Sequence, residues 1–376
     1  MKTRTSWMLL TLVPALAGAQ RAAPTPSLKD LFKDAFVVGT ALAPRQFLNE
    51  DTANVALIKR QFNAITPENV LKWEVVHPQP GIFNFEPSDA YVKFGETNGM
   101  FIVGHTLVWH SQTPRWVFQD ADGKPLTRDA LLARMKDHIE HVMGRYKGRI
   151  RGWDVVNEAL EEDGTMRKSP WQRIIGDDFV VKAFEYAHAV DPSAQLYYND
   201  YNLATPAKRD GAVALVKKIR AAGVPVTAIG SQDHHKLDWP SAALVDSMFM
   251  AFRAANVHVA ITELDVDVLP RATRENTADV ALRAQAEARL NPYVAGLPDS
   301  VQRELATRYK DMFTVYMKHR DILDRVTFWG ATDGDSWLNG WPVRGRTNHP
   351  LLFDRDRKPK PAFDAVVSTA MPPAIP

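Results

Sequence analysis

The amino-acid sequence predicts an α/β fold, a single (β/α)8 TIM barrel. Eight short apolar runs with the character of β-strands alternate with segments of helical periodicity, which is typical of a parallel sheet. Eight is the number of strands that closes such a barrel, and a chain of 376 residues is long enough to form one. The alternative, a doubly wound open sheet, is disfavoured because no Gly-rich phosphate-binding turn follows the first strand.

The expected elements follow in chain order. Folding is expected to begin at Ser27, which with Asp30 resembles a capping box in front of a short helix. An irregular pattern over 267–299 predicts an extended loop after the seventh strand, where loops shape the groove of a barrel. Apolar residues at helical spacing predict helices that include 55–62, 130–146, 213–219 and 242–255. The apolar runs predict strands at 36–41, 64–66, 101–104, 153–158, 195–198, 227–230, 257–263 and 325–329.

The N-terminus has the pattern of a secretory signal peptide. Lys2 and Arg4 supply positive charge, an apolar segment follows over 7–15, and small residues allow cleavage near Ala19. We therefore expect a secreted or periplasmic protein. The expected organisation is a signal peptide over 1–19, a linker over 20–26, one catalytic barrel domain over 27–370 and a tail over 371–376.

The composition excludes several classes of function. The net charge is only +2 and no Lys/Arg cluster is present, so we expect no nucleic-acid partner. No later segment is long and apolar enough to cross a membrane, so we expect no membrane partner. We also expect a monomer. The chain has no cysteine, which excludes disulfides, thiol catalysis and Cys-ligated metal sites. Ten Trp is a high count, and we expect about half of them in the core.

Two of the predicted strands end on a glutamate. The fourth strand ends with Asn157 and Glu158, and the seventh strand is apolar until Glu263. Neither polar ending has a packing reason. Two carboxylates at the tips of separate strands are the arrangement that cleavage of a glycosidic bond needs.

The remaining strand ends carry polar and aromatic residues as well. In a barrel the carboxyl ends of the strands converge on one face, so these residues become neighbours whatever their separation in sequence. Such groups bind sugar hydroxyls and stack on the apolar faces of pyranose rings. They are Glu68, Asn69, Lys72, His105, Trp109, Asn157, Tyr201, Gln232, His234, Asp265, Trp329 and Trp337.

These segments, in this order and at this spacing, resemble glycoside hydrolase family 10, the endo-β-1,4-xylanases. The resemblance covers nearly the whole chain after the signal peptide. It implies a retaining endo-xylanase acting on xylan and xylooligosaccharides, with Glu158 as general acid/base and Glu263 as nucleophile. It also implies an aglycone-side role for Tyr201. The residues that it places along the glycone subsites are Glu68, Asn69, Lys72, His105, Trp109, Asn157, Gln232, His234, Trp329 and Trp337.

The chemistry of a retaining hydrolase fits these residue types. The acid has to hold its proton near neutral pH, whereas the nucleophile has to be ionised. His234 is expected to bridge Asp265 and Glu263, which would orient the nucleophile and keep it ionised. Asn157 is placed to bind a sugar 2-hydroxyl, and a pair of Trp rings would favour xylose, which lacks a hydroxymethyl group.

Alternatives and departures accompany this interpretation. A metal site at the histidines of two strand ends is disfavoured, because they lack the helical spacing of a zinc motif, and we expect no metal and no cofactor. A β-1,4-glucanase or mixed xylan/glucan hydrolase would use the same site. A sugar-binding barrel without turnover would lack one of the two glutamates, and both are present.

The sequence departs from the family pattern in two places. Asp233 stands where many members have Gly, and the loop after Glu263 is long.

Overall fold

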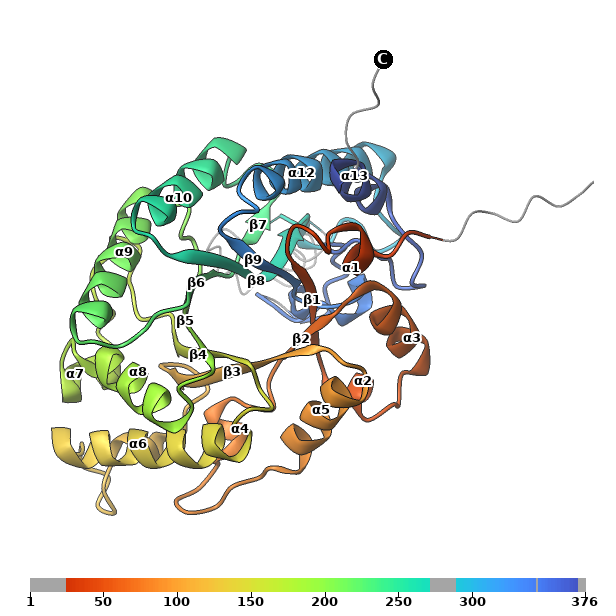
Figure 1. The fold of residues 1–376 in the computed structure, drawn as a ribbon. Helices are drawn as coiled ribbons and strands as arrows, with labels where there is room; N and C mark the ends of the chain where they lie inside the picture. Colours follow the sequence, from red (N-terminus) through yellow and green to blue (C-terminus); the bar gives the residue numbers. More distant parts are fainter. Residues whose placement is uncertain (1–24, 271–288, 343, 371–376) are drawn as a thin grey trace, which may run out of the picture.

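The computed structural model describes residues 25–270, 289–342 and 344–370, and a closed barrel of parallel strands forms its centre (Figure 1). Neighbouring strands pair in chain order from the first to the sixth, and the remaining two close the ring between the sixth and the first. The predicted (β/α)8 barrel is confirmed. Its strands are β1 (Val37–Leu42), β2 (Ala64–Pro67), β3 (Phe101–Trp109), β4 (Gly152–Asn157), β5 (Gln195–Asp200), β6 (Ala228–Ser231), β8 (His258–Asp267) and β9 (Leu323–Phe328).

Helices surround the barrel because each has one apolar face to bury against the strands (Figure 1). No helix in the described ranges is long and apolar enough to cross a membrane. The α-helices are α1 (Leu28–Leu31), α2 (Pro44–Phe47), α3 (Thr52–Gln61), α4 (Trp73–Val76), α5 (Glu86–Thr97), α6 (Arg128–Arg145), α7 (Pro170–Ile175), α8 (Phe179–Val190), α9 (Pro206–Ala221), α10 (Ala242–Ala254), α12 (Asp299–Lys318) and α13 (Pro361–Ala370), and the 3-10 turns are η1 (Arg115–Phe118), η2 (Asp333–Asp335) and η3 (Trp337–Asn339).

All eight predicted strands are present, and β3 and β8 extend furthest beyond their apolar runs. β3 continues to Trp109 and β8 to Asp267, and most of the added residues are buried. Both extensions keep pairing with a neighbouring strand, although the register shifts between His105 and Val108 and between Ile261 and Leu264. At the end of β4 the prediction was one residue too long. Glu158 lies just past the strand, with a φ of 57°.

The close approach of β3 and β4 depends on a glycine. A Cβ atom on Gly104 would lie 2.1 Å from the ring of Trp153, which is fully buried. Only glycine therefore lets the indole of Trp153 lie across β3. This contact fixes the register that places the ends of the two strands side by side.

Sequence periodicity located some helices and missed others. The helices at α1, α3, α6, α9 and α10 were predicted, whereas α5, α8, α12 and α13 were not. The buried residues of α8 include Val180, Ala183, Phe184 and Ala187 at helical spacing, so the same periodicity rule could have located this helix. The capping box at Ser27 is wrong, because its hydroxyl donates to the carbonyl of Arg60 and leaves the helix end uncapped.

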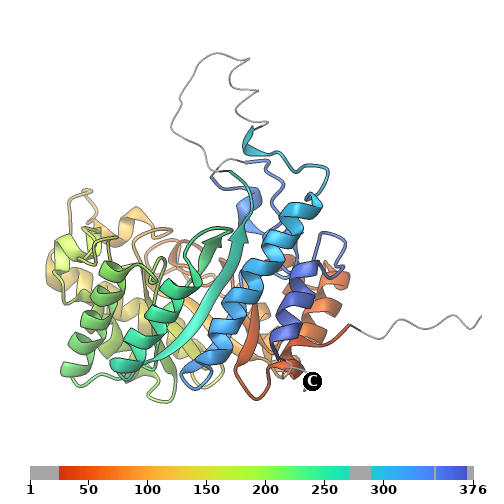
Figure 2. The ribbon, with the colours of Figure 1, turned by 90° about the horizontal axis from the view of Figure 1, so that it is seen from above.

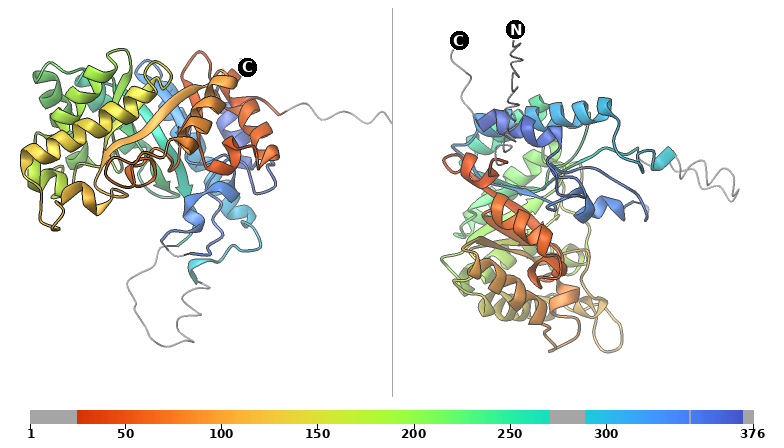
Figure 3. Two further views of the ribbon diagram at one scale, coloured as in Figure 1. Left: turned by 90° about the horizontal axis from the view of Figure 1, so that it is seen from below. Right: turned by 90° about the vertical axis from the view of Figure 1, so that its right-hand side faces the viewer.

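An additional short strand, β7 (His234–Lys236), lies outside the barrel ring and pairs in parallel with the end of β8. Figure 2 shows β8 running diagonally past α12, toward the end of the barrel where residues 289–298 lie. Residues 271–288 of the expected long loop lie outside the described residues. The described part, 289–298, packs on the segment after η3, where Asn291 bonds to Gly345 and Thr347 (Figure 3).

Candidate active site

A cavity of about 600 Å³ opens at the carboxyl ends of the barrel strands. A second cavity of similar volume at the opposite end contains neither glutamate nor tryptophan. All fourteen residues that the sequence proposed for the site line the first cavity. They are Glu68, Asn69, Lys72, His105, Trp109, Asn157, Glu158, Tyr201, Gln232, His234, Glu263, Asp265, Trp329 and Trp337.

Glu263 lies within β8, and both oxygens of its buried carboxylate are hydrogen-bonded. Oε1 accepts from Nδ2 of Asn199 at 2.8 Å, and Oε2 lies 3.3 Å from Nε2 of His234. Nδ1 of the same imidazole lies 3.0 Å from Oδ1 of Asp265. The expected bridge from Asp265 through His234 to Glu263 is therefore present.

The charges around this bridge keep Glu263 ionised. Burial lowers the pKa of His234, but the charge of Asp265 and the hydrogen bonds to Asp265 and Glu263 raise that pKa to about 10. Burial likewise tends to raise the pKa of Glu263. The bond from His234, the neighbouring imidazole charges and the bond from Asn199 outweigh burial, so the pKa of Glu263 lies below its ordinary value.

Glu158 comes from the end of β4, and its carboxyl contacts only neutral donors at hydrogen-bond distance. Oε2 accepts from the indole of Trp109 at 2.9 Å. Oε1 accepts from the amides of Gln232 at 3.0 Å and Asn157 at 3.3 Å. The left-handed backbone of Glu158 costs about 1 kcal/mol for a non-glycine residue.

Asn199 links the two glutamates. Its amide Nδ2 bonds to Glu263 and to Oδ1 of Asn157, and the hydroxyl of Thr262 donates to its Oδ1 at 2.6 Å. Gln232 also donates to Oδ1 of Asn157, at 3.3 Å. A continuous set of amide hydrogen bonds thus connects the carboxyl on β4 with that on β8.

A buried lysine lies on another wall of the cavity. Nζ of Lys72 donates to Asn69 at 2.9 Å and to Gln112 at 2.8 Å, and it lies 5.1 Å from the ring centre of Trp109. Burial lowers the pKa of Lys72, an effect that the negative charges of Glu263, Glu68 and Glu158 partly offset. Burial raises the pKa of Glu68.

Indole rings form the apolar side of the cavity. Trp337 and Trp341 have ring centres 5.0 Å apart, and Nε1 of Trp337 donates to Asp265 at 2.8 Å. Trp329 lies edge-on to the rings of His105 and His234. The remaining tryptophans include Trp73, Trp153 and Trp171, which are core residues.

Comparison with known proteins identifies the family of this chain. The model of the Glycosyl hydrolase family 10 matches residues 27–369. The chain belongs to this family. It is therefore a glycoside hydrolase.

Several family 10 relatives are similar over nearly their whole length. Endo-1,4-beta-xylanase A of Xylanibacter ruminicola is 44% identical over 358 residues, which cover 95% of this chain and 96% of the relative. A beta-1,4-xylanase of Dictyoglomus thermophilum is 42% identical, with 91% and 90% covered. Among solved structures, a family 10 endoxylanase from a sugarcane soil metagenome has a TM-score of 0.86 and 47% identity, covering 92% of this chain and 99% of that one.

Some residues of the site received no role from sequence reasoning. Asn199 follows the fifth predicted strand, where the strand-end rule marks it as a polar residue, but its contact with Glu263 depends on barrel closure. Gln112 comes from the loop after β3, and Arg167 from the loop after β4, where no pattern marks them. Trp341 also lines the cavity. A group of three His, Asp or Glu side chains placed to hold a metal ion is absent from the part of the chain that the structure describes.

Asp233 is the residue at which the sequence is expected to depart from the family 10 pattern. Its φ is 55°, a conformation that glycine adopts freely and Asp tolerates better than most residues. The buried carboxylate accepts from Ser231 at 2.5 Å and from Tyr316 at 2.6 Å. This residue therefore ties the segment carrying Gln232 and His234 to α12.

Proposed function

We propose that the protein is an exported endo-1,4-β-xylanase that hydrolyses internal β-1,4-xylosidic bonds of xylan with retention of configuration. The proposed nucleophile is Glu263 and the proposed general acid/base is Glu158. Several relatives are named as endo-1,4-beta-xylanases, and a solved structure with 33% identity and a TM-score of 0.81 is a complex with xylotriose. Both support xylan and xylooligosaccharides as substrates.

The observation that carries the proposed roles is the difference between the surroundings of the two carboxyls. Glu263 contacts a protonated imidazole, whereas Glu158 bonds to neutral N–H groups. Two carboxyls held in different environments on one cavity are suited to opposite protonation states. A retaining hydrolase requires that assignment of nucleophile and acid.

In the proposed first step, a carboxylate oxygen of Glu263 forms a bond to the anomeric carbon of a xylose unit. The bond from that carbon to the leaving oxygen breaks, and Glu158 gives its proton to that oxygen. In the second step Glu158 removes a proton from water, which attacks the anomeric carbon and releases Glu263. Each step inverts the anomeric carbon, so the product retains the β configuration.

The surrounding residues have supporting roles in this proposal. Nδ2 of Asn157 is available to a sugar 2-hydroxyl, a contact that strengthens as positive charge develops on the ring. Lys72 supplies positive charge and a donor on the glycone side. The rings of Trp329 and Trp337 form a wall that suits a sugar without a hydroxymethyl group, which favours xylan over cellulose.

A proton NMR time course on unbranched β-1,4-xylooligosaccharides tests the proposal. We expect the β-anomer to appear first and to mutarotate later. Initial appearance of the α-anomer would exclude Glu263 as nucleophile. Faster hydrolysis of carboxymethyl-cellulose than of xylan would instead favour a β-1,4-glucanase, and complete inactivity would favour a binding protein.

Export and oligomeric state are separate proposals. Residues 1–19, the proposed signal peptide, lie outside the described residues, and export rests on their sequence pattern. We propose that the exported chain acts as a monomer, because an open cleft has to accommodate a polymer. N-terminal sequencing of exported protein should begin near Gln20, and light scattering should give the mass of one chain.

A further inference from the structure

The backbone of Glu158 is held on both sides by residues outside its own strand. Its N–H donates to the carbonyl of Asn199 at 2.8 Å, and its carbonyl oxygen accepts from Nε of Arg167 at 3.0 Å. The amide of Ala159 bonds to the hydroxyl of Tyr198 at 3.2 Å. Because Glu158 has a positive φ, these contacts select the backbone conformation that directs its carboxyl into the cavity.

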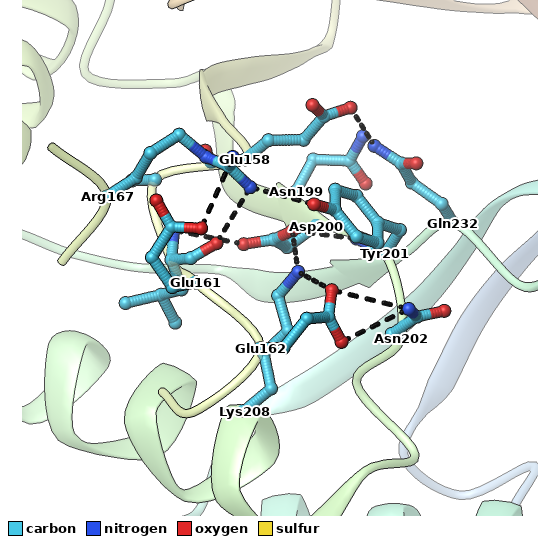
Figure 4. A network of polar contacts seen from close by, with 12 residues as sticks. Glu158, Glu161, Glu162, Arg167, Asn199, Asp200, Tyr201, Asn202, Lys208 and Gln232 are labelled. Carbon is cyan, nitrogen blue, oxygen red and sulfur yellow. Dashed lines mark hydrogen bonds and ion pairs between the residues drawn. The ribbon is translucent and has the colours of Figure 1, made fainter. Parts of the chain in front are cut away.

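Arg167 makes several of its contacts with main-chain oxygens of the same loop. Nη2 donates to the carbonyl of Leu160 at 3.0 Å and to the hydroxyl of Tyr201 at 2.7 Å. On its outer side Nη1 lies 3.4 Å from Glu161, whose side chain is 43% exposed. The planar guanidinium thus joins the loop after β4 to the segment after β5 (Figure 4).

Tyr201 lies between two cations. Its hydroxyl bonds to Arg167, and Nζ of Lys208 lies 3.3 Å from the centre of its ring. Lys208 is fully buried and forms an ion pair of 3.0 Å with Asp200, which is also fully buried. Figure 4 shows this arrangement, in which Arg167 and Lys208 approach Tyr201 from different directions. Tyr201 is therefore a rigid support, and it also lines the cavity.

We propose that Arg167 is a positioning residue for Glu158. It binds the Glu158 carbonyl and the Tyr201 hydroxyl with one guanidinium, and so fixes the backbone that aims the Glu158 carboxyl at the leaving oxygen. Arg167 has no part in bond breaking itself. The inference rests on the proposed role of Glu158 as general acid, and it adds a residue that acts through Glu158 and not on the sugar.

Substrates with different leaving groups separate positioning of the acid from a general structural role. A phenyl leaving group needs a proton from the acid, whereas 2,4-dinitrophenolate leaves without one. We would measure kcat/KM for the phenyl and 2,4-dinitrophenyl β-xylobiosides, because this parameter covers substrate binding and the first bond cleavage and is independent of the second step. The full-length mature protein is compared with its variants Arg167→Met, Arg167→Lys and Tyr201→Phe.

Arg167→Met should lower kcat/KM by about 50-fold on the phenyl substrate and by less than about 3-fold on the dinitrophenyl substrate. Tyr201→Phe, which keeps the ring beside Lys208, should show the same selectivity with a loss of about 5-fold. The matched control Glu161→Gln removes only the outer ion pair of Arg167 and should leave both rates within about 2-fold.

Equal losses of Arg167→Met on both substrates would overturn the inference, because they would indicate a structural role. The inference would also be overturned if Arg167→Lys kept the wild-type ratio of kcat/KM on the two substrates. Lysine keeps the positive charge but lacks the planar guanidinium that donates to two acceptors at once. Should Arg167→Met not fold, the lysine and Tyr201→Phe variants decide. Glu158→Ala is the reference: if it fails to discriminate between the substrates, the proposed acid role itself fails. If it discriminates and the Arg167 variants do not, only the positioning role fails.

Discussion

Nε2 of His234 lies 3.3 Å from Oε2 of Glu263, and the other nitrogen of the same ring contacts Asp265. This relationship gives the buried Glu263 a cationic partner inside the cavity. Because the pKa of His234 is raised to about 10, the imidazole stays protonated over the pH range in which the enzyme would work. Glu263 therefore has its negative charge balanced without a metal ion.

Replacing Glu263 with Gln should abolish hydrolysis while preserving the fold. The substitution keeps the shape of the side chain and its bond to Asn199 but removes the nucleophilic oxygen. We expect kcat on xylan to fall by roughly 10⁴-fold or more. Thermal unfolding should remain within a few degrees of the wild type. Glu185→Gln on α8, a partly exposed residue that pairs with Lys182 outside the cavity, provides the control. Near wild-type turnover would exclude Glu263 as nucleophile.

His234→Asn should move the acidic limb of the kcat/KM profile to higher pH. The bond from His234 counteracts burial and lowers the pKa of Glu263, so its removal leaves burial to raise that pKa. Protonated Glu263 cannot attack, and activity is then lost at a higher pH as the solution is acidified. His258→Asn, at an exposed position on β8, should leave the limb in place. An acidic limb unchanged in His234→Asn would contradict the electrostatic role.

Asn199→Ala should impair catalysis although the residue does not carry out a chemical step. It removes the donor to Oε1 of Glu263 and a partner of Asn157. We expect kcat/KM to fall by about 10²-fold, as for other preorganised donors in active sites. Asn98→Ala, at the end of α5, is the matched control. If kcat/KM fell only in Asn98→Ala, or fell equally in Asn98→Ala and Asn199→Ala, the amide network would be dispensable for catalysis.

Acidification should destabilise the protein through two buried histidines. The Nδ1 atoms of His77 and His138 are 3.2 Å apart, and His138 stacks on Trp73. Burial lowers the pKa of His77 to about 4 and the pKa of His138 well below its ordinary value. Since the unfolded chain binds these protons first, the stabilisation is present above about pH 6.5 and is lost as the pH falls toward 4.

The variant His138→Phe isolates this effect because it keeps an aromatic ring against Trp73. Between pH 7 and pH 5 both proteins should lose unfolding free energy. The loss in the wild type should exceed that in the variant by about 2 kcal/mol. Urea denaturation at the two pH values measures the difference. The exposed His141→Gln is the control, and identical pH dependence in all three proteins would contradict the assignment.

Substitutions at Asp233 should separate backbone strain from side-chain bonding. Asp233→Ala and Asp233→Gly both lose the bonds to Ser231 and Tyr316. Only alanine keeps the cost of a positive φ, so the alanine variant should be less stable than the glycine variant by about 1 kcal/mol. Chemical denaturation of the two variants gives this difference directly. Equal stabilities would mean that the backbone relaxes.

Much of the site could be predicted from the sequence because a barrel brings its strand ends together. Glu158 and Glu263 were found as polar endings of apolar strands, and all fourteen proposed residues line one cavity. The bridge from Asp265 through His234 to Glu263 was also predicted. These inferences needed only strand assignments and the rule that carboxyl ends of parallel strands converge.

The tertiary structure alone decided how these residues are held. The bond of Asn199 to Glu263 joins strands 64 residues apart, and the contact of Tyr316 with Asp233 joins α12 to the barrel. Arg167 reaches Tyr201 through a loop without periodicity. Hydrophobic patterning specifies which residues face inward or end a strand, because burial follows sequence spacing. Hydrogen-bond partners depend on distances between strands in the closed barrel. A pattern along the sequence contains no information about these distances.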